Sequence, residues 1–367
     1  MLAVQVGGAS GVGRSGSQTR KGTSRGPLVA GVLAMGVVLV ASVVVTIGLG
    51  SATIAPLDTA RYLWAALTGG SITAAEVPQY QIVWQVRTPR VLLAAVVGAG
   101  LGVVGVVVQA MVRNALADPF VLGVSSGASA GAVAVIVFGV LAGLGVHAVS
   151  AGAFLGALLA SGLVYAASAT RSGITPLRLV LTGIALSFGF QAVMSVLIYF
   201  APDGEATSTI LFWTMGSFGA ASWDSLPVVA VVVVLGAVVL RRFGRVLDAM
   251  ALGDETASSL GVDTGLVRTA LFVLTSLMTG AMVAVSGAIG FVGLVLPHLV
   301  RLVVGAGHAR VLVVAPFVGA VFMVWVDLVS RVLVAPRELP LGAITALVGV
   351  PVFVVLMRRR AYLFGGR

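Results

Sequence analysis

One stretch of the chain, Gly123-Val124-Ser125-Ser126-Gly127, has the spacing of a catalytic serine motif. In serine hydrolases, Gly-x-Ser-x-Gly forms a sharp strand-to-helix turn, and a histidine activates the exposed hydroxyl. Here the flanking residues are apolar and helical in pattern, and the candidate bases His147 and His298 have no evident acid to orient them. The sequence therefore favours helix packing by small residues over catalysis, and we predict no catalytic residue.

The sequence also gives no support for a nucleotide-binding site or a metal site. A P-loop needs Gly-x-x-x-x-Gly-Lys-Ser/Thr, but the only lysine, Lys21, follows Arg20 near the N-terminus. The chain has no cysteine and three histidines in separate segments, so no thiolate or clustered-histidine metal site is expected. We predict a protein that is not an enzyme, has no ATPase site or cofactor, and handles a bulky substrate that brings its own chelator.

The composition is that of a membrane protein. Hydrophobic residues make up 59% of the chain and charged residues 9%, whereas soluble domains carry about a quarter charged residues. A helix needs about 20 apolar residues to cross a bilayer. The sequence predicts an all-α, polytopic integral membrane protein with about ten transmembrane helices. The segments are Pro27–Gly50, Val91–Val112, Pro119–Thr170 (two spans broken near Gly143–His147), Leu179–Pro202, Ser225–Leu240, Thr269–Pro297 (broken at Ser286-Gly287), Val311–Val326 and Leu339–Met357.

Basic residues predict the orientation in the membrane. If the first span starts on the inner side, 17 of the 22 Lys and Arg residues face the cytoplasm. The positive-inside rule therefore favours a cytoplasmic location for both termini. We expect the protein to lie in the inner (plasma) membrane of the cell. This basic charge lies between spans and indicates no nucleic-acid partner; the apolar surface faces membrane lipid. We expect a disordered cytoplasmic tail over residues 1–26, a transmembrane domain over 27–360, and a cytoplasmic tail over 361–367.

The 48 glycines fit close helix packing. Two pairs, Gly98/Gly102 and Gly152/Gly156, have the G-x-x-x-G spacing that lets helix backbones approach in a membrane.

Three segments carry a resemblance to a known family. They are Val86-Arg-Thr-Pro-Arg-Val-Leu-Leu93, Leu252-Gly-Asp-Glu-Thr-Ala-Ser-Ser-Leu-Gly-Val262 and Val292-Gly-Leu-Val-Leu-Pro-His-Leu-Val-Arg301. Together they resemble the permease subunits of type II ABC importers for ferric siderophores, haem and cobalamin. The likeness runs from about Val83 to Phe353, with Ala115 standing where the family's inner turn usually has proline.

The resemblance implies a function and partners. Such a permease forms a dimer with an identical or sister subunit around a central path. A substrate-binding protein delivers the substrate, and separate ABC ATPase subunits drive transport. We expect a ferric siderophore as substrate, with haem or cobalamin as the alternative. An ion-coupled secondary transporter is the alternative from another class, although Asp327, the one acid well inside a span, stands four residues before Arg331 and suggests a helix-face pair.

The loop Leu252–Val262 is the predicted ATPase-coupling element. Acids follow Gly253 at a helix start, and Gly261 stands where a C-terminal cap belongs, so a short helix is expected. An ordinary amphipathic loop is the other interpretation. The resemblance makes this region, within cytoplasmic helices over 246–264, the contact with the ATPase. The predicted coupling residues are Leu252, Gly253, Asp254, Glu255, Ala257, Leu260 and Gly261.

Two further sites are expected at the outer face. The resemblance implies that Arg87, Arg90 and Arg331 receive acidic residues of the binding protein, although interfacial arginines with an Arg331–Asp327 pair would explain them equally well. Thr207–Trp223 is too interrupted to span, so we expect a short helix at the outer mouth, where the resemblance implies a gate-associated helix. An interfacial aromatic belt is the alternative. The predicted gate residues are Trp213, Met215, Gly216 and Phe218. Pro297-His298 predicts a helix irregularity, with His298 forming a structural hydrogen bond rather than a metal bond.

Overall fold

The computed structural model describes residues 25–50, 52, 54–170 and 173–358, and every regular element there is helical. The tail expected over residues 1–26 lies outside this part, except that its last two residues begin the first helix. The tail expected over 361–367 also lies outside the described residues.

The helices match the predicted spans. Seven apolar stretches of the described chain are long enough to cross a membrane, and three shorter apolar helices occupy the remaining predicted spans. The prediction of an all-α, multi-pass membrane protein is therefore confirmed. The long helices are α1 (Arg25–Gly48), α4 (Thr88–Met111), α6 (Ala148–Ser168), α7 (Pro176–Tyr199), α9 (Ser225–Arg242), α12 (Thr264–Ser286) and α14 (His308–Val332), and the shorter ones are α5 (Val124–Phe138), α13 (Val292–Val304) and α15 (Leu341–Arg358).

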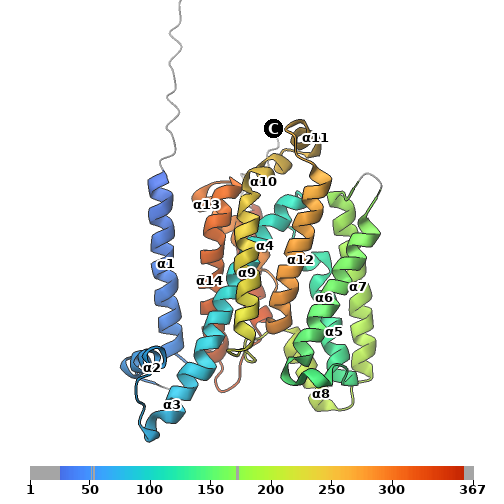
Figure 1. Ribbon diagram of the computed structural model, residues 1–367. Helices are drawn as coiled ribbons and strands as arrows, with labels where there is room; N and C mark the ends of the chain where they lie inside the picture. Colours follow the sequence, from blue (N-terminus) through green and yellow to red (C-terminus); the bar gives the residue numbers. More distant parts are fainter. Residues whose placement is uncertain (1–24, 51, 53, 171–172, 359–367) are drawn as a thin grey trace, which may run out of the picture.

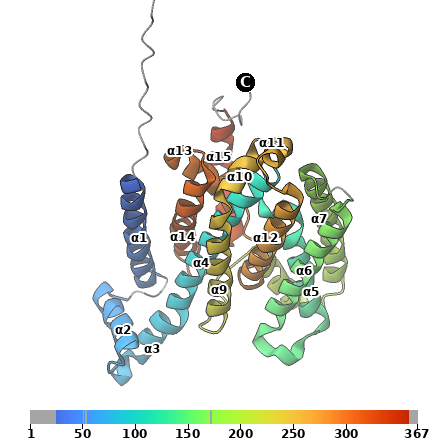
Figure 2. The ribbon, with the colours of Figure 1, turned by 45° about the horizontal axis from the view of Figure 1, so that its top comes forward.

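Short elements gather at the two ends of the helix bundle. The α8 end carries α2 (Pro56–Thr68), α3 (Val77–Gln81), a π-helical turn (Ile82–Arg87) and α8 (Gly204–Thr214). The α11 end carries α10 (Gly244–Ala251) and α11 (Asp254–Ser259), close to the end of α15 (Figures 1 and 2). Three 3-10 helices, η1 (Ala74–Glu76), η3 (Pro119–Leu122) and η4 (Ala142–His147), complete the connections.

Helix α4 is the centre of the fold. It runs obliquely through the bundle and contacts α1, α9, α12, α13 and α14 (Figure 1). Helices α5, α6 and α7 form a second group, which joins the first through contacts of α12 with α5 and α6. Most of α4 is buried, whereas α1 and α7 expose most of their apolar surface. Burial on all sides explains why α4 has no polar face that its sequence could reveal.

Glycines set the distances between these helices. A Cβ atom at Gly98 would lie 2.2 Å from the backbone oxygen of Gly319, and one at Gly105 would lie 2.1 Å from that of Gly293. In the second group, a Cβ at Gly156 would lie 2.2 Å from the oxygen of Gly127. The predicted close-packing role of the G-x-x-x-G pairs is confirmed.

Both breaks that the sequence predicts within long apolar segments are present. Helix α12 ends at Ser286, and Gly287 adopts φ 65°, a conformation that side chains disfavour. An irregular stretch leads from there to Phe291 before α13 begins. The α5–α6 break contains η4, with Gly139 and Gly145 also at positive φ.

The irregularity expected at Pro297-His298 is absent, because α13 remains helical through both residues. Proline at 297 cannot donate to the oxygen of Gly293, one turn earlier. The Nε2 atom of Gln109, on α4, supplies donors instead, at 3.2 Å to Gly293 O and 3.0 Å to Leu294 O. A donor from the neighbouring helix thus replaces the one that proline lacks, and α13 continues without a break.

The Gly98–Gly319 contact generates a test of the packing. Gly98→Val should lower the stability of the purified protein by about 1–3 kcal/mol, because no flexible side chain can yield to the new methyl groups. The matched control is Gly162→Val, at an exposed position of α6 with no atom within 4 Å of the new Cβ. Thermal unfolding in detergent measures both, and equal melting temperatures for the two variants would contradict the packing role of Gly98.

Candidate functional site

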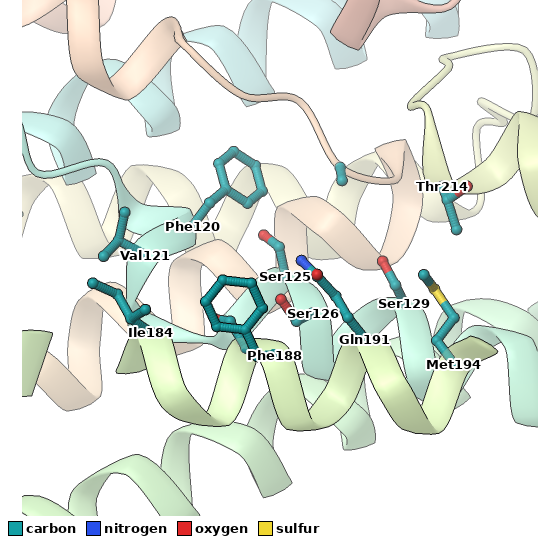
Figure 3. A pocket seen from close by; sticks show the side chains of 12 residues that line it. Phe120, Val121, Ser125, Ser126, Ser129, Ile184, Phe188, Gln191, Met194 and Thr214 are labelled. Atoms are coloured by element: carbon teal, nitrogen blue, oxygen red, sulfur yellow. The ribbon is translucent and has the colours of Figure 1, made fainter. Parts of the chain in front are cut away.

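A cavity of about 440 Å³ lies between α5, α7 and η3 (Figure 3). Its lining contains hydroxyl and amide groups together with aromatic and aliphatic side chains, and none of the lining residues is charged. The Oγ atom of Ser125 is buried there without a hydrogen-bond partner, and the side chain of Gln191 points toward it from α7. The lining residues are Phe120, Val121, Ser125, Ser126, Ser129, Ile184, Ser187, Phe188, Gln191, Met194, Thr214 and Ala288.

The position of Ser125 decides against the hydrolase interpretation of its motif. Ser125 lies in the first turn of α5, with no base bonded to its hydroxyl. His298, one candidate base, instead places its Nε2 atom 2.7 Å from the oxygen of Ala115. Gly127 packs against α6, where a Cβ would meet Ala160 at 2.3 Å. This serine can therefore offer a hydrogen bond to a molecule in the cavity, but it lacks the partner that nucleophilic catalysis needs.

The turn between α4 and η3 leads directly into Phe120 and Val121, which line the cavity. His298 binds this turn at Ala115, the position where the resembling family usually has proline. Asp118 caps η3 by accepting a hydrogen bond from Phe120 N at 2.9 Å. Burial raises the pKa of the Asp118 carboxyl to about 6, although hydrogen bonds from the backbone of Phe120 and Phe291 oppose this shift. The Asp118 cap thus fixes the backbone that presents Phe120 to the cavity.

The predicted gate segment connects three parts of the chain at the α8 end. Helix α8 begins three residues before the predicted start of this region and ends at Thr214, and residues 215–224 are irregular. Ser217 N donates to Ser286 O at 2.8 Å, and Leu341 N donates to Gly216 O at 3.0 Å. Gly216 has φ 81° and lies so close to Ala288 O that a Cβ would be 2.7 Å from it. The segment is a backbone junction between α8, α12 and α15.

The other predicted gate residues surround this junction. Phe218 is fully buried, Trp213 is partly buried, and Met215 is exposed. Trp213 also lines a second cavity, of about 520 Å³, beneath α8, together with Phe212 and Ser217. Of the four predicted gate residues, Trp213 lines this second cavity, and its neighbour Thr214 lines the first.

The three arginines predicted for docking are also brought together, but they are buried, with residue exposures of 4% for Arg87, 5% for Arg90 and 7% for Arg331. Arg90 forms a fork, with Nε 2.8 Å from Asp327 Oδ1 and Nη1 2.7 Å from Glu338 Oε1. The Arg331–Asp327 pair suggested by the sequence is present, at 3.0 Å.

Arg87, Arg90 and Arg331 form an arginine cluster, in which Arg87 and Arg331 also bind the end of α1. Arg87 Nη1 donates to Gly48 O at 3.0 Å and Arg331 Nη2 donates to Thr46 O at 3.2 Å, so both bind carbonyls at the end of α1. The last carbonyls of a helix have no partner within the helix. In this conformation the arginines therefore hold α1 against α4 and α14, and their role in docking stays a prediction.

The predicted coupling element forms a short helix, α11, as its acids and glycines indicated. Gly253 precedes it with φ 118°, and Gly261 follows it with φ 83°. Ala257 is fully buried, whereas Leu260 is 65% exposed and Leu252 is 68% exposed. Asp254 and Glu255 occupy the first turn, where acids favour the helix dipole. The element presents leucines outward from the α11 end while one alanine anchors it inward.

Sequence reasoning missed three residues that organise these sites. Glu338 completes the fork on Arg90, and no local pattern in the sequence indicates this pairing. Gln109 donates to carbonyls of α13 and accepts a hydrogen bond from Arg301 Nη1 at 2.7 Å, again without a local signal. The third residue is Arg268. It is the one charged residue in α12, and that isolation in an apolar helix was the available signal.

The sequence of this chain is similar to those of known membrane transport proteins. Residues 38–359 match the model of the FecCD transport family. The chain belongs to that family. It is 38% identical to the hemin transport system permease protein HmuU of Yersinia pestis, over 86% of this chain and 93% of that protein. It is 40% identical to the cobalamin import system permease protein BtuC of Halobacterium salinarum, over 76% of this chain and 74% of that protein.

A solved structure agrees with the family assignment. An inward-facing conformation of a metal-chelate type ABC transporter superposes with a TM-score of 0.77, at 33% identity, over 89% of this chain and 98% of that one. The protein is therefore a multi-pass membrane permease of the ABC importer class, and the expected resemblance is confirmed.

Proposed function

We propose that this permease translocates a ferric siderophore that a substrate-binding protein delivers, and that separate ATPase subunits drive the transport. The observation that carries the substrate proposal is the uncharged cavity between α5 and α7. Within the described residues, no group of three or more His, Asp or Glu side chains could hold a metal ion. Iron would therefore pass inside its chelator, whose polar atoms meet serine hydroxyls and the Gln191 amide while its apolar parts meet Phe120 and Phe188.

Haem and cobalamin remain the alternative cargoes, because relatives with those names match the chain closely. All three cargoes are large complexes that enclose their metal. A cavity with hydroxyls, one amide and aromatic rings favours a neutral chelate, since an anionic cargo would find no basic side chain among its lining residues.

A second permease subunit, identical or a sister, would close the path. Helix α7 exposes large apolar side chains, among them Leu181, Phe188 and Val196. Phe188 lies on both this exposed surface and the cavity wall, so a partner subunit packed on α7 would also complete the cavity. The remaining apolar surface, including that of α1, faces membrane lipid.

The α11 end would face the cytoplasm of an inner (plasma) membrane, as the distribution of basic residues predicts. In this orientation both chain termini are cytoplasmic, and α10 and α11 meet the ATPase. The exposed Leu252 and Leu260 support this contact, because apolar side chains outside the bilayer need a protein partner to leave water.

An ion-coupled mechanism has less support. It would require a carboxylate free to bind a coupling ion, and buried Asp327 is already paired with Arg90 and Arg331.

The function is tested by uptake into cells that express the permease with its binding protein and ATPase. We expect import of a ferric hydroxamate, with inactivation of the ATPase abolishing uptake and a proton uncoupler alone leaving it intact under conditions that maintain ATP. Hemin and cobalamin form the other arms of the panel. Uptake of either one instead of the ferric chelate would select that alternative, and uptake that depends on the uncoupler but not on the ATPase would support ion coupling.

The coupling contact predicts the effect of two substitutions. Leu260→Asp would bury an unpaired carboxylate in the ATPase contact, and Gly261→Trp would place a ring at a residue with φ 83°. Each should reduce uptake by about tenfold or more, equivalent to about 1.4 kcal/mol of lost coupling, while the permease stays in the membrane. Leu57→Asp, at a leucine of the α8 end that is 82% exposed, is the control. Normal ATPase co-purification and uptake in both variants would show that α11 is only a connector.

Docking of the substrate-binding protein is proposed at the α8 end, through Arg87, Arg90 and Arg331. Because these side chains are buried, docking would proceed by exchange, in which an incoming acid takes the place of Glu338 on Arg90. The Glu338 side chain is 31% exposed, so an approaching carboxylate can reach this bond.

The exchange predicts that Glu338→Gln strengthens docking severalfold, because a neutral amide competes less well for the guanidinium. Glu205→Gln, which removes an exposed acid on α8 at the same end, controls for net charge. Affinity of the binding protein for the permease in nanodiscs, at low and physiological salt, measures both variants. Unchanged or weaker binding by Glu338→Gln would contradict the exchange.

A further inference from the structure

Arg268 is the most deeply buried charged side chain at the α11 end, with 2% of its side chain exposed. It lies in the second turn of α12, and all the remaining residues of that helix are uncharged. An unpaired buried charge would cost several kcal/mol, so the guanidinium must have compensating partners.

Those partners come from three separate segments. Nε donates to Met111 O, at the last residue of α4, over 3.3 Å, and Nη1 donates to Ile174 O, just before α7, over 2.8 Å. Nη2 donates to Asp254 Oδ1, at the first residue of α11, over 2.8 Å. The rigid guanidinium fork thus joins α12 to the central helix, a cavity-lining helix and the helix proposed to contact the ATPase.

The three bonds differ in how readily they can break. Met111 O belongs to the terminal turn of α4, where carbonyls lack helical partners, so Arg268 satisfies a group that would otherwise be unpaired. Asp254 is partly exposed, with 36% of its side chain accessible, and within the described part of the chain it forms the one ion pair that joins α11 to another element. The link to α11 can therefore release while the two carbonyl bonds persist.

Helix α10 is held in a different place. His308, at the start of α14, has Nδ1 2.7 Å from Asp248 Oδ1, and its backbone N donates to the same oxygen at 2.9 Å. Loss of the Arg268–Asp254 pair should consequently free α11 without freeing α10. Release of α11 alone would therefore distinguish loss of the Arg268–Asp254 pair from a general loosening of the α11 end.

We propose that Arg268 is a positioning residue that transmits displacement of α11 to the adjacent ends of α4 and α7. This role rests on the proposed function, because α11 must meet the ATPase for the displacement to drive transport. Arg268 contacts no substrate; it acts through α7, whose Ile184, Phe188 and Gln191 line the cavity.

The first test measures positions in the purified permease without any partner. The chain has no cysteine, so Ser258→Cys on α11 and Leu177→Cys on α7, both exposed, can carry a single pair of spin labels. We expect a narrow distance distribution in the labelled parent and a broad one after Arg268→Gln or Asp254→Asn. Asp254→Asn removes the ionic link but leaves both carbonyl bonds, so it remains informative if Arg268→Gln misfolds.

Two controls isolate the link. Arg310→Gln, at an exposed arginine in the first turn of α14, should leave the distribution narrow. A label pair at Arg245→Cys on α10 and Leu177→Cys should stay narrow in the Asp254→Asn variant, because Asp248 still holds α10. Narrow α11–α7 distances in both link variants would overturn the proposal.

The second test measures coupling in the assembled transporter, with whichever of ferric hydroxamate, hemin and cobalamin the unaltered protein imports. Asp254→Asn should lower transport per ATP hydrolysed by about tenfold while ATPase activity is retained, as expected for one lost charge-assisted bond. A merely structural role would lower assembly, hydrolysis and transport together. Unaltered transport per ATP in Asp254→Asn would overturn the proposal, whereas failure of the unaltered protein to bind an ATPase would overturn only the proposed function.

Discussion

The contact between bare backbones along α4 is the constraint on which the other features depend. Where α4 meets α14 and α13, glycine faces glycine, and no side chain separates the helices. Helices in a bilayer gain little from apolar burial against each other, because lipid tails are equally apolar, so van der Waals contact at close range must hold them. With α4 fixed in this way, its two ends become reference points. One end receives the arginine cluster, and the other receives Arg268.

The buried arginines of this permease also connect separate parts of the fold. Two guanidinium groups beside α4 bind groups from more than one segment. Arg90 joins α14 to the loop before α15, and Arg268 joins α4, the residue pair before α7, and α11. Carbonyls at helix ends are among the acceptors, since these groups lack partners inside their own helices. The arginines therefore connect ends of helices, while glycines connect their middles. Neither role requires contact with the cargo.

Much of this architecture could be predicted from the sequence, for identifiable reasons. Spans follow from the length of apolar segments, and the α11 helix follows from acids and glycines at its two ends. Burial of Arg87 and Arg90 could not be read in the same way, because their partners, Glu338 and the carbonyls of α1, are far away in sequence. The intact helix at Pro297 had a similar cause. Its replacement donor, Gln109, lies 184 positions from Gly293, and no local pattern indicates it. Local chemistry was predictable, and compensation across helices was not.

The Gln109 side chain also limits how the molecule can move. If α13 slid along α4 by one residue, the amide would leave Gly293 O without a donor, inside a membrane that offers no water in exchange. Helices α4 and α13 are therefore mechanically one body, clamped by a hydrogen bond as well as by shape. Helices α5 and α6 form another, through their own glycines. The uncharged cavity lies beside the second pair, lined by α5, α7 and the loop at Ala288. A conformational change of this permease therefore has to carry each helix pair as a unit, because neither pair can slide internally without losing its close contacts.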